Sequence, residues 1–110
     1  MDIHVKMVEQ VTVIALAGDI DGKTAPEVQE RILAEVLPAA KILLDMSQVA
    51  YMSSAGLRVL LATHRQVTSH KVVLGLVGLS EEIEDTMSAT GFLNFFTTYQ
   101  TLEAGLAALS

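Results

Sequence analysis

The spacing of apolar positions along the chain predicts alternating strands and helices. Residues 3–7 alternate between apolar and polar side chains, with Met7 on the apolar side, which is the period of a half-buried strand. Residues 11–17 are apolar at almost every position and rich in β-branched side chains, a pattern that favours a central strand covered on both faces. The pair Glu9-Gln10 between them suits a tight turn, so the two segments are expected to form a hairpin.

The first predicted helix follows a break rich in glycine and aspartate at residues 18–22. Thr24 opens this helix, and Glu27 follows three residues later at the spacing of a capping box. Pro26 lies in the first turn, where its missing N–H removes no hydrogen bond. Pro38 is expected to end the helix, because the residue before a proline disfavours the helical conformation. The apolar residues at helical spacing are Val28, Ile32, Leu33, Val36 and Leu37.

Residues 41–45 form a short apolar run that is typical of a buried strand. Because strand, helix and strand follow one another here, the second and third strands are expected to be parallel. Residues 45–53 show no clear periodicity, which predicts a connection longer than the roughly 2–6 residues usual between a strand and a helix. An amphipathic helix is expected to begin around Leu57, to be capped by the serines Ser53 and Ser54 just ahead of it, and to end near residues 69–70.

The last part of the chain predicts a fourth strand, two further helices and a short fifth strand. The fourth strand covers residues 72–77, and the next helix runs from a cap at Ser80 to a stop at Gly91. A short strand is expected at residues 93–97, and Thr101 caps the final helix. The order is therefore ββαβαβα(β)α, an α/β fold in which a small mixed sheet of about four to five strands is packed with four helices.

Composition narrows the classes of protein and of partner. The chain of 110 residues is 51% hydrophobic, which suits a single domain over residues 1–110 with one core. Its net charge of −6 disfavours a nucleic-acid surface, so a protein or small-molecule partner is expected. The absence of cysteine excludes disulfides and thiolate metal sites. No signal peptide or membrane span of roughly 18 apolar residues is present, so we expect a cytoplasmic protein without membrane attachment.

Polar residues gather where the predicted parallel strands end. The carboxyl ends of such strands share one edge of a sheet, so Asp19 and Asp21 are expected near Ser54, although both aspartates are also typical turn residues. A nucleophilic Ser54 would need a base, but His64 lies ten residues further along a helix, about 15 Å away. His64 and His70 lack the spacing of metal ligands. We therefore expect no enzyme activity, no metal and no cofactor.

Four motifs resemble, in order and spacing, the STAS domains of bacterial anti-sigma factor antagonists. They are Gly18-Asp19-Ile20-Asp21, Thr24-Ala25-Pro26-Glu27, Leu43-Leu44-Asp45-Met46-Ser47 and Met52-Ser53-Ser54-Ala55-Gly56-Leu57. The resemblance covers nearly the whole chain, and the segment that ends in Ser-Ala-Gly-Leu is its most specific part. The fold of this family, a small mixed sheet packed with helices, agrees with the predicted element order.

The resemblance implies a phosphorylation switch. In such proteins the unphosphorylated form binds an anti-sigma factor that is also a serine kinase of the histidine-kinase ATPase type, and this frees the sigma factor. Phosphorylation of a serine at the helix start releases the antagonist, and a metal-dependent serine phosphatase resets it. Ser54 falls on the phosphoacceptor position. Ser53, the second candidate acceptor, stands where the best-known members carry aspartate.

The resemblance also places the partner surface around the helix start. The implied partner-binding residues are Asp19, Asp21, Ser53, Ser54, Ala55, Gly56, Leu57 and Arg58. A phosphate at a helix N-terminus faces free N–H groups and the positive end of the helix dipole, so we expect the fold to tolerate it. The alternative is a scaffold or sensory STAS module that binds a protein or a small anionic ligand without being phosphorylated. The oligomeric state is left open.

Overall fold

A computed structural model describes residues 1–109, and Ser110, the last residue of the predicted domain, lies outside the described residues. Within this range, five strands form one sheet in the order β1-β2-β3-β4-β5. The strands are β1 (Asp2–Val8), β2 (Val11–Ala17), β3 (Lys41–Gln48), β4 (Val73–Val77) and β5 (Thr97–Tyr99). Strand β1 is antiparallel to β2, and each later neighbouring pair is parallel.

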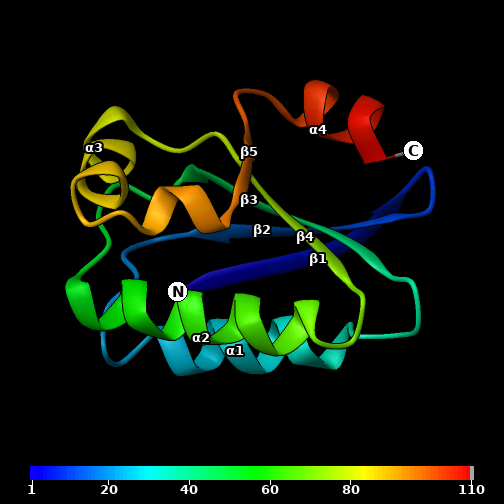
Figure 1. Cartoon of the computed structure of the whole chain (residues 1–110), viewed down its shortest axis with the longest axis horizontal. Helices are drawn as coiled ribbons and strands as arrows, with labels where there is room; N and C mark the ends of the chain where they lie inside the picture. Colours follow the sequence, from blue (N-terminus) through cyan, green and yellow to red (C-terminus); the bar gives the residue numbers. More distant parts are fainter. Residues whose placement is uncertain (110) are drawn as a thin grey trace.

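The helices are α1 (Ala25–Ala34), α2 (Ser54–Thr68), α3 (Glu81–Ala89) and α4 (Leu102–Leu109), with a short 3-10 helix η1 (Phe92–Phe95) before β5. The predicted α/β class and element order are therefore confirmed. Helices α1 and α2 lie side by side over one face of the sheet, whereas α4 lies over the opposite face (Figure 1). Helix α3 lies near the end of the sheet where α2 begins.

Two cores lie on the two faces of the sheet. The main core lies between the sheet and helices α1 and α2, and Ile83 and Met87 of α3 extend it. A smaller core lies under α4, which packs its leucines on the other face of the central strands. This cluster contains Val11, Leu43 and Val77, with Leu102, Leu106 and Leu109 packed against it. Strands β2 and β3 are apolar at successive positions because both of their faces are covered.

Strands β1 and β2 form the predicted hairpin around a two-residue turn. Glu9 and Gln10 have φ values of 51° and 69°, and two positive values in succession are typical of the type I′ turn that joins antiparallel strands. Met7 was predicted to be half-buried, but 66% of its surface is exposed because it lies beside the turn, outside the main core. Its sulfur accepts a hydrogen bond from Thr12 Oγ1 at 3.1 Å.

Two predicted boundaries are wrong. Helix α1 ends at Ala34 instead of continuing to Leu37, because Val36 packs against the main core from irregular backbone and Leu37 is 67% exposed. Strand β3 continues to Gln48 instead of ending near residue 45, because the end of β2 pairs with it as far as Gln48. The connection to α2 is therefore shorter than predicted.

The predicted capping box at Thr24 does not form, although α1 does begin directly after Thr24. The Thr24 hydroxyl accepts a hydrogen bond from the Asp21 N–H at 2.9 Å and donates one to the Asp19 carbonyl at 2.8 Å. This side chain therefore closes the preceding loop instead of capping the helix. In contrast, Ser80 caps α3 as predicted, with its oxygen 3.2 Å from the N–H of Ile83.

The predicted fifth strand exists, but its predicted bounds, residues 93–97, are wrong. Gly91 has a left-handed φ of 79° and begins the turn into η1, so residues 92–95 are helical and β5 starts at Thr97. Phe96, which is 8% exposed, is buried in the main core, and Phe92 and Leu93 of η1 are half-buried and pack against it. Phe95 remains half exposed, and the guanidinium of Arg65 lies 5.9 Å from its ring centre.

Candidate functional site

The loop that follows β2 and the loop that follows β3 meet at the start of α2. Ile20 and Met52 form an isolated parallel bridge between the two loops. The N–H of Ile20 donates to the Tyr51 carbonyl at 2.9 Å, and the N–H of Ser53 donates to the Ile20 carbonyl at 2.8 Å. The predicted approach of residues 18–22 to the helix start is therefore confirmed.

The two serines at the start of α2 have different environments. Ser53 is the N-cap residue, with an extended backbone (φ −75°, ψ 166°), and its Oγ accepts the N–H of Gly56 at 3.0 Å. Ser54 is the first helical residue and is exposed. Its hydroxyl forms no hydrogen bond with any other group of residues 1–109. Ser53 therefore caps the helix, whereas Ser54 presents a free hydroxyl to solvent.

Removal of the Ser53 cap is expected to destabilise the domain. The variant Ser53→Ala should lower the free energy of unfolding by about 0.5–2 kcal/mol, because the N–H of Gly56 loses its acceptor. The variant Ser53→Asp should be close to the parent, since aspartate is an equally good cap. Ser54→Ala is the matched control and should change the free energy by less than about 0.5 kcal/mol. Urea denaturation followed by circular dichroism measures all three, and a larger loss in Ser54→Ala than in Ser53→Ala would contradict this assignment.

Gly56 allows a very close approach between α2 and the loop after β2. A Cβ atom at this position would lie 2.7 Å from the Ile20 carbonyl oxygen and 2.9 Å from the Ile20 Cγ2 atom. Leu57, the next residue, is only 2% exposed. Both residues were predicted to bind the partner, but the structure places them in the interior. Their role at this site is to fix the helix start that carries Ser54.

Asp19 and Asp21 flank Ile20 and differ in their bonding. The carboxylate of Asp21 accepts the N–H groups of Thr24 at 3.0 Å and Lys23 at 2.9 Å. These two backbone hydrogen bonds hold the pKa of Asp21 below its ordinary value of 3.8. Asp21 therefore stabilises the loop as an ionised turn residue, and the side chain of Asp19 is exposed.

An open groove of about 470 Å³ runs beside Ser54, between the start of α2 and α3. Its lining residues are Tyr51, Met52, Ser53, Ser54, Leu57, Arg58, Thr86, Thr90 and Phe92. Tyr51, Thr86, Thr90 and Phe92 were not among the predicted site residues. Tyr51 is 51% exposed, and its position in the sequence, shortly before the two serines, could have indicated that it belongs to the site. The other three become neighbours of Ser54 only through the packing of α3 and η1.

The start of α2 is suited to an added negative charge. Its first turn has no acidic side chain, whereas the first turn of α3 contains Glu81, Glu82 and Glu84. The positive end of the α2 dipole is therefore not neutralised by the helix itself. Arg58 is exposed one turn further along α2.

His64 does not provide a base for Ser54. Both residues lie on one continuous helix, so ten residues separate them by about 15 Å. The His64 ring instead packs on Phe96 with 4.6 Å between ring centres, and burial lowers the pKa of His64 below its ordinary value of 6.5. His64 is therefore excluded as a base for the Ser54 hydroxyl.

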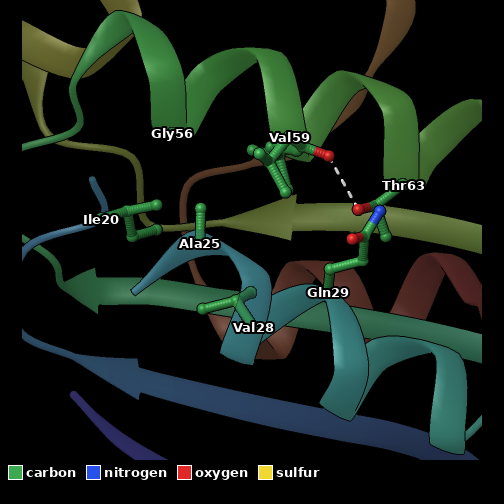
Figure 2. Close-up of a pocket in the computed structure, with 8 residues that line it drawn as sticks. Ile20, Ala25, Val28, Gln29, Gly56, Val59 and Thr63 are labelled. Carbon is green, nitrogen blue, oxygen red and sulfur yellow. Dashed lines mark hydrogen bonds between the residues drawn. The ribbon is translucent and has the colours of Figure 1, made fainter. Parts of the chain in front are cut away.

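A small cavity between α1 and α2 is too small for a ligand. Figure 2 shows its lining, which includes Ile20 and Gly56 at one end and Gln29 and Thr63 at the other. Its volume of about 10 Å³ holds at most one water molecule.

Among residues 1–109 no three His, Cys, Asp or Glu side chains are grouped as metal ligands. No helix in the same range is long and apolar enough to cross a membrane.

Comparison with known proteins gives matches over most of the chain. The STAS domain family matches residues 2–105. The anti-sigma-B factor antagonist of Listeria monocytogenes is 33% identical over 79 residues, which cover 71% of this chain and 69% of the relative. The anti-sigma-B factor antagonist of Bacillus subtilis is 27% identical over 106 residues, which cover 96% and 97% of the two chains.

A solved structure extends this similarity to the fold. The crystal structure of an anti-sigma factor antagonist from Mycobacterium paratuberculosis is 28% identical, has a TM-score of 0.85 and covers 98% of this chain and 92% of its own. The sequence motifs, the mixed sheet and the family match agree with one another. The chain therefore belongs to the STAS domain family.

Proposed function

We propose that this chain is an anti-sigma factor antagonist whose binding is switched off by phosphorylation of Ser54. Its family membership and the names of its relatives in Listeria and Bacillus support the antagonist function. The observation that carries the switch is the exposed Ser54 hydroxyl at the N-terminus of α2, next to a serine whose oxygen is already used as the cap. On this proposal the chain is a regulatory binding module formed by one STAS domain over residues 1–110.

The proposed cycle has two forms of the protein. In the cytoplasm, the unphosphorylated form binds an anti-sigma factor that is also a serine kinase of the histidine-kinase ATPase type, and the sigma factor is released. The kinase transfers the γ-phosphoryl group of ATP to Ser54 Oγ, ADP leaves with the bridging oxygen, and the hydroxyl proton passes to a base of the kinase. A metal-dependent serine phosphatase hydrolyses the phosphoserine and restores the binding form.

The charges around Ser54 support this switch. A phosphate adds about −1.5 to −2 charge, which the free N–H groups and the dipole of α2 can accept without rearrangement of the helix. The hydrogen bonds of Ile20 with Tyr51 and Ser53 hold the backbone just before α2, and we expect them to persist in the phosphorylated form. The change that the partner meets is therefore the new charge itself, beside the exposed side chain of Asp19.

Ser53 is compatible with this role. Serine and aspartate are equally good N-cap residues, so the hydrogen bond to the Gly56 N–H is kept whichever of the two stands at this position. On this interpretation Ser53 replaces the aspartate of the best-known members as a cap, and Ser54 remains the acceptor.

A second candidate function is supported by the groove beside Ser54. The free Ser54 hydroxyl and the Arg58 cation line this groove of about 470 Å³, together with Thr86 and Thr90, whose hydroxyls donate to backbone carbonyls of α3. Such a lining suits a small anionic ligand, as in a sensory STAS module that is not phosphorylated. The two candidates differ in whether a charge on Ser54 changes the binding of a protein partner.

The binding of anti-sigma factor kinases from the same genome tests the proposed function. In calorimetric titrations, the unphosphorylated chain should bind one of them, and Ser54→Asp should bind it at least about tenfold more weakly, a difference of about 1.4 kcal/mol. Phosphorylated protein should bind more weakly still, since phosphate carries more charge than aspartate.

The matched control for this titration is Thr101→Asp. Thr101 caps α4 with its oxygen 3.1 Å from the N–H of Ala104, so the variant adds the same charge at a helix N-terminus on the other face of the sheet. Thr101→Asp should bind like the parent. Equal affinities of the parent, Ser54→Asp and the phosphorylated protein would reject the switch and favour the scaffold alternative.

A further inference from the structure

We propose that strand β1 pairs with β1 of a second copy of this chain, in one antiparallel register centred on His4. Strand β1 is at one edge of the sheet, and its register with β2 runs from residue 2 to residue 8 without interruption. No other strand of residues 1–109 pairs with its outer side. This proposal concerns an interaction surface that is separate from Ser54, so it does not depend on the proposed function.

The turn determines which backbone groups face the free edge. Val8 and Val11 flank the two-residue turn, so they form a hydrogen-bonded pair. Because such pairs alternate along an antiparallel ladder, the even-numbered residues of β1 direct their N–H and C=O groups to β2. The N–H and C=O groups of Ile3, Val5 and Met7 therefore point away from the sheet and are available to another strand.

The register centred on His4 matches these groups with one another. In an antiparallel pair of identical strands, His4 then lies opposite His4 of the second copy, and Ile3 lies opposite Val5. Both Ile3 and Val5 have outward backbone groups, so the pair exchanges two hydrogen bonds on each side of the two-fold axis. The pair also places one β-branched side chain opposite another, which favours strand pairing.

The charges of β1 select the same register. Asp2 of each copy lies opposite Lys6 of the other, which gives two pairs of opposite charge in the dimer. A register centred on Val5 would place Lys6 opposite His4 and leave Asp2 opposite an apolar residue. A lysine on an edge strand discourages pairing with unrelated strands, but in this register it meets an aspartate. The sequence Asp2–Lys6 is therefore complementary to itself.

The two-fold axis of such a dimer is perpendicular to the sheet. The two sheets join into one continuous sheet, and α1 and α2 of both copies lie on the same face of it. The sheet edges that carry Ser54 then lie at opposite ends of the dimer. Both functional edges therefore remain open. Because one strand pair buries little surface, we expect a weak dimer, with a dissociation constant between roughly 1 µM and 1 mM.

Sedimentation equilibrium of charge variants tests the register. Asp2→Lys and Lys6→Asp each turn the two opposite-charge pairs into like-charge pairs. Each variant alone should therefore dimerise with an affinity at least about tenfold lower than that of the parent. An equimolar mixture of the two variants, and the double variant with the charges exchanged, should recover the affinity of the parent. Lys71→Asp, the same charge change at an exposed residue after α2, should leave the affinity unchanged.

A backbone variant tests the edge itself. Val5→Pro removes an outward N–H and no hydrogen bond to β2, so it should give a folded monomer, whereas Val5→Thr keeps the N–H and should dimerise. Circular dichroism verifies the fold of both variants. A parent protein that is monomeric up to about 1 mM would overturn the proposal. So would a dimer that survives in Val5→Pro, or a mixture of charge variants that fails to recover the dimer.

Discussion

Replacement of Ser54 by alanine is expected to abolish phosphorylation of this chain by its anti-sigma factor kinase. The reason is that Ser54 has the free hydroxyl at the start of α2, whereas the oxygen of Ser53 accepts the N–H of Gly56. Incubation with the kinase and ATP, followed by intact-mass measurement and peptide mapping, should show one phosphate on the parent and none on Ser54→Ala. The mass increase of one phosphate should therefore be lost completely in Ser54→Ala. This expectation rests on the proposed function.

Ser53 provides the internal control for this experiment. The variants Ser53→Ala and Ser53→Asp should still be phosphorylated on Ser54, because neither removes the acceptor. Ser53→Ala should react more slowly, since loss of the cap loosens the backbone that presents Ser54. A phosphate mapped to Ser53 in the parent, or uptake that persists in Ser54→Ala, would show that the assignment of the acceptor is incorrect.

Replacement of Gly56 by alanine is expected to cause the largest loss of stability among single-methyl changes at this site. The added Cβ would lie 2.7 Å from the Ile20 carbonyl oxygen, a backbone atom that is held by the N–H of Ser53. Such overpacking costs typically about 1–3 kcal/mol of unfolding free energy. Thermal denaturation should therefore show a fall in Tm of several degrees, and phosphorylation of Ser54 should become slower.

The matched control is Gly22→Ala, on the other side of the same junction. A Cβ at Gly22 would meet the Ala55 side chain at 3.8 Å, which is an ordinary contact. Because alanine also restricts the unfolded chain, this variant should be as stable as the parent or more stable by up to about 1 kcal/mol. Equal losses in the two variants would mean that the close contact at Gly56 is not what fixes the helix start.

The sequence pattern was sufficient where a segment's own residues decide its structure. The β-branched run of β2, the serine caps and the break around Gly18 each act locally, so the element order and the serine cap of α2 followed from them. The meeting of the two loops at the start of α2 was predictable for a different reason, because parallel strands bring their carboxyl ends to one edge of a sheet. The sequence also led to the STAS family through motifs at those ends.

The wrong predictions concern residues whose structure depends on distant neighbours. Ser47 and Gln48 are polar, and β3 reaches Gln48 because this residue pairs with Ala17 of β2 beyond a shift in register. Val36 has helical spacing but packs from irregular backbone. The hydroxyl of Thr24 could cap α1 or close the loop before it, and the sequence allows both. In the folded domain it closes the loop. The groove residues of α3 have no local signal, because they meet Ser54 only after the domain has folded.

The double anchoring of the α2 start at Ile20 has a consequence for timing. Two backbone hydrogen bonds tie the loop after β3 to this residue, and if both persist after phosphorylation, the binding and non-binding forms of the proposed switch share one backbone. No slow structural transition then separates them. The response time of the circuit would be determined by the catalytic rates of its kinase and phosphatase, and the amount of each enzyme would be the means of tuning it.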